Sequence, residues 1–193
     1  MNAENRFALH NKFSVLIFLL VACFLLVTLR ASAQSCLSAN DMDASTRSAL
    51  TATAQRYFDM AAKGDVFNLK LNSIPSLASN FTGIETAVID NKAAFAGAQA
   101  TPRPPFLLQA QGTNPNPRAE FLCGVFGSQG QTRDSAVFVI PNLPPGNYGV
   151  VVLDINGQKG PYTLTMVLQQ MGNDWKLGGY YAKASEIAGH DAP

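Results

Sequence analysis

The stretch from 135 to 183 contains four apolar runs separated by residues that form turns. The turn residues are Pro144-Pro145-Gly146-Asn147, the segment 156–160, and Gly172-Asn173-Asp174. Short runs rich in β-branched and aromatic residues, separated in this way, are typical of β-strands joined by tight turns. The pattern therefore predicts an antiparallel meander of four strands.

The runs differ in how apolar and polar residues alternate. Residues 137–140 and 150–155 are almost continuously apolar, which is typical of central strands covered on both faces. In the last run, strict alternation places one set of side chains on a common face, namely Trp175, Leu177, Gly179 and Tyr181. Two earlier strands are predicted at 106–111 and 120–126, with a turn-rich loop at 112–117 between them.

The first half of the chain has the spacing of amphipathic helices instead. Between Asp41 and Lys63, apolar residues recur at i, i+4, i+7, i+8 and i+11, which places them on one face of a helix. They are Leu50, Ala54, Tyr57, Phe58 and Ala61. Gly64 is expected to end this helix. The opposite face carries Arg47, Thr51, Gln55 and Asp59, which indicate a solvated surface.

Two shorter helices are predicted after Gly64. Pro75 suits the first turn of a helix that extends to Ser79. Thr82 and Glu85 have the spacing of a capping box, which would open a further helix. The prolines at 102, 104 and 105 then force an extended connection into the strand region.

Helices first and strands afterwards predict an α+β fold, with N-terminal helices packed on a curved antiparallel β-sheet. The length of 193 residues fits one domain with a substantial core. We therefore predict a single domain over residues 34–184 and a tail over 185–193.

The N-terminus carries the features of an export signal. An unbroken apolar run of 17 residues at 13–29 follows Arg6 and Lys12, and Ala31-Ser32-Ala33 comes directly after it. A basic start, an apolar segment and a small-x-small site predict a signal peptide over residues 1–33, so that the domain is secreted or periplasmic. The run also reaches the lower limit for a membrane span. An uncleaved anchor with the domain outside the cytoplasm is the alternative, and it would be the only membrane contact.

Two cysteines follow residue 33, Cys36 and Cys123. An even pair in an oxidising compartment predicts one disulfide. Neither cysteine has a histidine or a basic cluster nearby in the sequence to lower its pKa, so a structural role is expected.

The charged residues after residue 33 are balanced and scattered. There are 11 Lys and Arg against 12 Asp and Glu, a net charge of −1. Because the basic residues form no cluster or stripe, nucleic acid and a charged membrane surface are not expected partners.

The order of these features resembles one superfamily. A first helix ends in Ala61-Ala62-Lys63-Gly64-Asp65, short helices follow, and the sheet closes on Trp175-Lys176-Leu177. This order, over roughly 41–183, is similar to that of the nuclear-transport-factor-2-like superfamily. The resemblance implies a cystatin-like cone in which a long helix lies across a bent sheet. The superfamily includes isomerases, dehydratases and cyclases as well as non-catalytic binding and assembly domains, so the fold transfers no function by itself.

A second resemblance competes with the first. Pro141-Asn142-Leu143-Pro144-Pro145-Gly146-Asn147-Tyr148, followed by three valines, is similar to a turn of transthyretin-like and carboxypeptidase-regulatory-like β-sandwiches. It implies an adhesion or carbohydrate-binding module. Such sandwiches lack a helical N-terminal half, so the predicted helices favour the cone.

The resemblance to the cone implies a pocket between helix and sheet, with Asp, His or Tyr as acid or base. The candidate lining residues are Tyr57, Asp59, Asp154, Trp175 and Tyr181. Asp154 interrupts an apolar run, where burial would raise its pKa. It also precedes the Asn156-Gly157 turn, which favours a solvated carboxylate.

Few residues of catalytic type are present. The one histidine after residue 33, His190, is the fourth residue from the end, and no cluster of metal ligands surrounds it in the sequence. We therefore expect no metal, no cofactor and no catalytic residue.

The favoured prediction is an exported non-catalytic domain that binds a small apolar ligand or a protein partner. The protein partner could be a second copy of the chain, in a homodimer. The alternative is a small isomerase or hydrolase that uses Asp59, Asp65 or Asp154 with a tyrosine. The deciding observation is whether the space between helix and sheet is filled.

Overall fold

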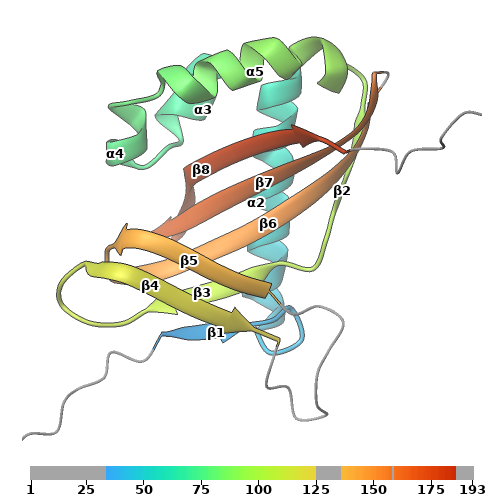
Figure 1. Ribbon diagram of the computed structural model, residues 1–193. Helices are drawn as coiled ribbons and strands as arrows, with labels where there is room; N and C mark the ends of the chain where they lie inside the picture. Colours follow the sequence, from blue (N-terminus) through green and yellow to red (C-terminus); the bar gives the residue numbers. More distant parts are fainter. Residues whose placement is uncertain (1–33, 125–135, 158, 186–193) are drawn as a thin grey trace, which may run out of the picture. The chain divides into compact units, whose positions relative to one another are not determined.

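The computed structural model describes residues 34–124, 136–157 and 159–185 of the chain (Figure 1). The predicted signal peptide at 1–33 and all but the first residue of the predicted tail lie outside the described residues. The disulfide, the helices and the sheet all lie inside them.

A short strand, β1 (Ser35–Leu37), is followed by four helices. They are α2 (Ala44–Lys63), α3 (Val66–Leu71), α4 (Pro75–Ala78) and α5 (Thr82–Phe95). The carboxylate of Asp43 caps α2 and accepts a hydrogen bond from the Thr46 amide at 2.7 Å. Gly64 ends α2 in the left-handed conformation with φ of 72°, as predicted, because glycine adopts this conformation without a steric penalty.

The start of α5 differs from the prediction. Phe81 occupies the N-cap position and no side chain caps the helix, while Thr82 is already helical. The predicted capping box of Thr82 and Glu85 is therefore wrong. Phe81 is only 3% exposed and belongs to the core, so apolar burial rather than side-chain capping fixes this end of the helix. Pro75 does open α4, which ends at Ala78.

Six strands form one curved, unclosed antiparallel sheet. Its path is β1, β3 (Phe106–Ala110), β6 (Gly146–Gly157), β7 (Gly160–Met171) and β8 (Asp174–Ala184), and β2 (Gln99–Pro102) pairs with the far half of β6. Helices together with this sheet confirm the α+β class. Neither β1 nor β2 was predicted, since both are short and lack an apolar run.

A separate two-stranded sheet consists of β4 (Asn116–Cys123) and β5 (Ala136–Leu143). The predicted meander is therefore right for β6, β7 and β8 but wrong for β5. The chain passes from one sheet to the other at Pro144-Pro145, and the Tyr148 hydroxyl donates to the Pro144 carbonyl at 2.8 Å across this turn. Residues 137–140 are not a central strand, because Val137 and Val139 are exposed on the outer face of β5. The loop predicted at 112–117 is partly wrong, since β4 begins at Asn116.

The two faces of the six-stranded sheet carry two different cores. One face packs against α2 and α5, and its buried residues include Val151, Leu153 and Ile155 of β6. The other face packs against β4 and β5 and includes Tyr148 and Val150 of β6. Because successive residues of a strand point to opposite faces, β6 serves both cores. In Figure 1, α2 crosses the sheet on one side and the β4–β5 pair covers part of the other.

The helices approach the sheet very closely at two glycines of β6. A Cβ atom on Gly149 would lie 2.1 Å from the Leu50 Cδ2 atom, and one on Gly157 would lie 2.3 Å from the Ala94 carbonyl oxygen. Leu50, Tyr57 and Ala61 of α2 are fully buried in the same core as the sheet residues. Side chains therefore fill the space between α2 and β6.

A bulge in β8 changes which side chains share a face. Leu168 pairs with Leu177, but Val167 pairs with Gly179, so Gly178 is an extra residue. Beyond the bulge the alternation is inverted. Tyr180 packs against the helix-side core, whereas Tyr181 is 64% exposed on the opposite face. The prediction that Tyr181 shares a face with Trp175 and Leu177 is therefore wrong.

Candidate functional site

Tyr57 and Trp175 are the two predicted pocket residues that the structure brings together. The Tyr57 side chain is fully buried, and its hydroxyl donates to the Trp175 carbonyl at 2.8 Å, with the Asn72 carbonyl 3.2 Å away. Burial raises the pKa of Tyr57, so the hydroxyl keeps its proton and remains a donor. Trp175 is only 7% exposed. The contact therefore fastens α2 to β8 and leaves Tyr57 no free hydroxyl for a ligand.

The other three predicted residues lie apart from this pair. Asp59 is exposed on α2 and accepts a hydrogen bond from Gln55 Nε2 at 3.1 Å. Asp154 forms a two-bond ion pair with Arg103, at 2.6 and 2.8 Å. These hydrogen bonds hold the pKa of Asp154 below its usual range, so its carboxylate is charged at neutral pH. With Tyr181 exposed on the outer face, the five residues form no common pocket.

Asp65, the remaining acid of the enzyme alternative, is used by the fold. It caps α3, where the Asn68 amide and side chain donate to its carboxylate at 3.2 and 2.7 Å. The Asn68 hydrogen bonds also lower the pKa of Asp65. A general acid or base at neutral pH requires the opposite shift, so Asp65 has the chemistry of a helix cap.

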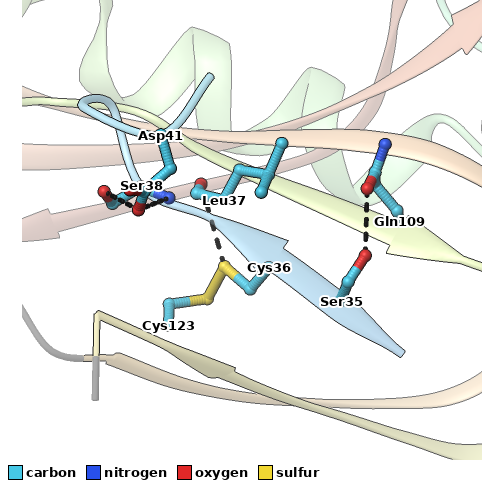
Figure 2. Close-up of a disulfide and its surroundings, with 7 residues drawn as sticks. All are labelled: Ser35, Cys36, Leu37, Ser38, Asp41, Gln109 and Cys123. Atoms are coloured by element: carbon cyan, nitrogen blue, oxygen red, sulfur yellow. Dashed lines mark hydrogen bonds between the residues drawn. A yellow bond between two sulfur atoms is a disulfide. The ribbon is translucent and has the colours of Figure 1, made fainter. Parts of the chain in front are cut away.

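The predicted disulfide between Cys36 and Cys123 is present. It joins β1 to β4, residues 87 apart in sequence, with 5.2 Å between the Cα atoms. Figure 2 shows the bridge between Cys36 and Cys123 and, farther along β1, the Ser35 hydroxyl, which donates to Gln109 Oε1 of β3 at 2.9 Å. Cys123 is fully buried in the smaller core. The bridge therefore links the six-stranded sheet to the β4–β5 pair covalently.

An open groove of about 800 Å³ lies between the N-terminal half of α2 and the connection from β2 to β3, and we name it the α2 groove. One wall is the flank of α2, and a second consists of Ser38, Ala39 and Asn40. The third wall is the connection itself. The α2 wall comprises Arg47, Ser48, Thr51, Ala52 and Gln55, and the connection comprises Pro102, Arg103, Pro104, Pro105 and Phe106.

The walls of the α2 groove differ in their chemistry. Three prolines in the connection lack an amide hydrogen, so this wall offers apolar rings and carbonyl oxygens. The α2 wall offers hydroxyl, amide and guanidinium groups. Arg47 Nη1 donates to the Ala39 carbonyl at 2.8 Å, which ties two walls together. The groove is therefore polar on one side and apolar on the other.

The connection is held in place by β6. The Arg103 amide donates to the Val152 carbonyl at 2.8 Å, and its guanidinium is paired with Asp154. The groove has two arginines, and Asp154 neutralises the charge of Arg103. Arg47 has no carboxylate partner among the described residues. Because this wall is already fixed, it loses little conformational entropy when a partner binds.

Sequence reasoning missed this groove. It assigned Arg47, Thr51 and Gln55 to a solvated helix face and treated the prolines as a connection. No local pattern shows that two such segments face one another, because the pairing of β2 and β3 with β6 brings them together. Three prolines within four residues, at 102, 104 and 105, were the only signal of a rigid surface.

Other kinds of site are not found in the described part of the chain. Over residues 34–124, 136–157 and 159–185, no group of three or more His, Cys, Asp or Glu side chains has the arrangement of a metal site. No helix in the same ranges has the length and apolar character that crossing a membrane requires. Comparison of the chain with protein-family models, with curated proteins and with solved structures gives no match.

Proposed function

We propose that this protein is an exported, non-catalytic binding domain that holds an extended segment of a partner protein in the α2 groove. The filled space between α2 and β6 carries the proposal. Leu50 and Tyr57 are fully buried there, and Gly149 leaves no room for even one methyl group. A small apolar ligand is therefore not favoured, and binding at the surface is.

Export is supported by two observations. The Cys36–Cys123 disulfide is of the kind that persists in oxidising compartments. The apolar run at 13–29, with Ala31-Ser32-Ala33 after it, has the pattern of a signal peptide. Secretion or periplasmic location with cleavage after residue 33 is the proposal, and an uncleaved anchor at 1–33 is its alternative.

The cone architecture is supported by the packing of the α2 stripe. Leu50, Tyr57 and Phe58 lie in one core with the inner face of β6, β7 and β8. A transthyretin-like sandwich, with the helices as an appendage, would leave this stripe away from the sheet. We therefore favour a cystatin-like cone related to the nuclear-transport-factor-2-like superfamily, many members of which bind without catalysis.

The groove suits an extended polypeptide for chemical reasons. A peptide backbone offers alternating amide hydrogens and carbonyl oxygens, which Ser48, Thr51 and Gln55 are able to match with donors and acceptors. Its apolar side chains suit the proline wall. The prolines lack the amide hydrogens that pairing with an added strand requires. The segment would therefore be bound by side chains of the groove and not by backbone pairing with the connection.

Two matched threonines allow a direct test. Thr51 Oγ1 donates to the Arg47 carbonyl, and Thr86 Oγ1 donates to the Thr82 carbonyl, each four residues back on a helix. Thr51 lines the groove, and Thr86 is exposed on α5. A Thr51→Trp variant fills the groove, and Thr86→Trp places the same ring on another surface.

The measurement is selection of a random peptide library, displayed on phage, against the immobilised protein. We expect the wild type and Thr86→Trp to enrich the same peptides and Thr51→Trp to lose them. Failure of the wild type to enrich any peptide would overturn the proposal. Equal binding by Thr51→Trp would also overturn it, because the peptides would then bind elsewhere.

A further inference from the structure

We propose that two copies of this protein pair antiparallel along the C-terminal half of β8, so that their six-stranded sheets become one continuous sheet. This inference concerns a second surface and does not depend on the α2 groove. It follows from the way the protein treats the two halves of one edge strand.

The N-terminal half of the β8 edge is capped by the protein itself. The sheet path ends at β8, so one side of this strand has no neighbouring strand in the described ranges. The Trp175 carbonyl accepts the Tyr57 hydroxyl. The Leu177 amide donates to the Asn72 carbonyl, and the Leu177 carbonyl accepts the Ile74 amide, both at 2.9 Å. These contacts satisfy the Trp175 carbonyl and both outward backbone groups of Leu177, just before the bulge.

Within the described ranges, the C-terminal half of the edge has no such cap. The Ser185 amide donates to the Pro161 carbonyl at 2.9 Å, so the backbone of Ser185 faces β7. Backbone groups alternate in direction along an antiparallel strand. Those of Tyr180, Ala182 and Ala184 must therefore face away from β7, and no backbone partner for them occurs among the described residues.

The opposite edge of the sheet is protected differently. It consists of the three-residue β1, together with β3 and β2. Pro102 ends β2, and Pro104 and Pro105 separate β2 from β3. Short strands and prolines are the usual protection of sheet edges against pairing. The C-terminal half of β8 has neither proline nor acidic residue, and Lys183 is its one charged side chain. Protection on this half of β8 is limited to Lys183 and the bulge at Gly178, so its unpaired backbone groups form a template for another strand.

A second copy of β8 satisfies this edge in one preferred register. Hydrogen-bonded pairs must form among the outward residues, and all three of them are paired only when Ala182 lies opposite Ala182 of the second copy and Tyr180 opposite Ala184. Tyr181 then lies opposite Lys183 of the second copy, in the pair type whose side chains are closest. A lysine over a tyrosine ring is attractive. A shift that pairs Ala182 with Ala184 would instead oppose the two Lys183 side chains.

The side chains at this edge leave space for the second copy. Tyr180 packs into the core that contains α5, whereas Tyr181 is 64% exposed on the other face. Lys183 and Ala184 are exposed as well. Figure 1 shows α5 beside β8. The Tyr181–Lys183 pairs of the dimer would form on the opposite, open side.

The test uses the full chain, produced in an exporting host, and sedimentation equilibrium over a range of concentrations. We expect the wild type to dimerise. Ala182→Pro removes an amide hydrogen that faces away from β7, so it keeps the ladder within the sheet and is expected to be monomeric. Circular dichroism checks that this variant is folded.

Two substitutions of the exposed Tyr181 provide a second arm in case Ala182→Pro does not fold. Tyr181→Lys opposes two lysines and is expected to raise the dimer dissociation constant on the order of tenfold, whereas Tyr181→Glu opposes unlike charges and is expected not to raise it. Lys176→Glu, on the capped half of β8, is the control and is expected to have no effect. A monomeric wild type would overturn the proposal, as would dimerisation that is equally strong in a folded Ala182→Pro variant or in Tyr181→Lys.

Discussion

The two faces of the six-stranded sheet are covered in different ways. Among the described residues, the helix-side core contains 21 buried residues, from α2, α3, α5, the sheet and the adjoining Met42 and Phe81, whereas the core under the β4–β5 pair contains eight. Burial of the larger apolar core contributes most of the free energy that holds the helices on the sheet. A two-stranded sheet is marginal in water, so the smaller layer needs further support.

The disulfide supplies that support at the smaller layer. Cys36 belongs to the six-stranded sheet through β1, and Cys123 ends β4. On the helix side the fastening is not covalent: the Tyr57 hydroxyl donates to the Trp175 carbonyl, and backbone hydrogen bonds join Leu177 of β8 to Asn72 and Ile74. The comparison indicates that the helix layer is fixed by packing and the β4–β5 layer by a covalent link. Each layer should therefore respond to a different perturbation.

Removal of the disulfide is expected to have the largest effect. Replacing Cys36 and Cys123 together by serine releases a loop of 87 residues in the unfolded chain. We expect the free energy of unfolding to fall by about 4–5 kcal/mol in the chain-entropy model. Urea unfolding followed by circular dichroism measures the change, and the reduced wild type is the control. A loss below about 1 kcal/mol would show that the smaller layer holds without the link.

Two buried phenylalanines sharpen the comparison. Phe95 in the helix-side core and Phe121 under the β4–β5 pair are 0% and 1% exposed. Phe95→Ala is expected to lower the free energy of unfolding by about 3–5 kcal/mol, with the disulfide present or absent. Phe121→Ala is expected to cost less while the disulfide is present.

The double variants test this difference. Since Phe121 and Cys123 belong to the same strand and the same small core, their effects on unfolding should couple. We expect Phe121→Ala to cost more in the background without the disulfide than in the wild type. Strict additivity for Phe121, or coupling for Phe95, would contradict the view that the disulfide supports one layer only.

The sequence alone predicted the helix side better than the other side. The spacing of Leu50, Tyr57 and Phe58 marked the buried face of α2, and Gly64 marked its end. These features were visible because a helix face and a helix end are encoded within a few residues. The pairing of Cys36 with Cys123 was also predicted, since only these two cysteines follow the predicted signal peptide and two cysteines allow only one bridge.

What the sequence did not show depends on distant contacts. The departure of β5 to a second sheet is decided by its pairing with β4, not by the Pro144-Pro145 turn. The bulge at Gly178 inverts the alternation of β8, and a single inserted residue has no signature of its own in the strand pattern. This is why Tyr181 was assigned to the wrong face. The α2 groove was missed for the same reason, since its walls are far apart in sequence.

The smallest expected effect concerns the part of the outer face that β4 and β5 leave open. Asp154 lies there with its side chain 45% exposed, paired with Arg103 of the groove wall. Arg103 lowers the pKa of Asp154 in the folded protein, whereas the unfolded chain has the ordinary value near 3.9. The pair therefore stabilises the fold above that ordinary value, and the contribution is lost as the pH falls through the lower folded pKa.

Asp154→Asn tests this sign. We expect the variant to be slightly less stable than the wild type from neutral pH down to about pH 5, and the difference to vanish at lower pH as Asp154 is protonated. Added salt should also reduce the difference, because the pair is partly solvated. Glu120→Gln, which removes the single-bond pair with Arg118 on β4, is the control with a smaller expected effect. A difference that persists unchanged in acid would mean that Asp154 stabilises the connection by shape and hydrogen bonding rather than by charge, and the α2 groove would then keep its proline wall at low pH.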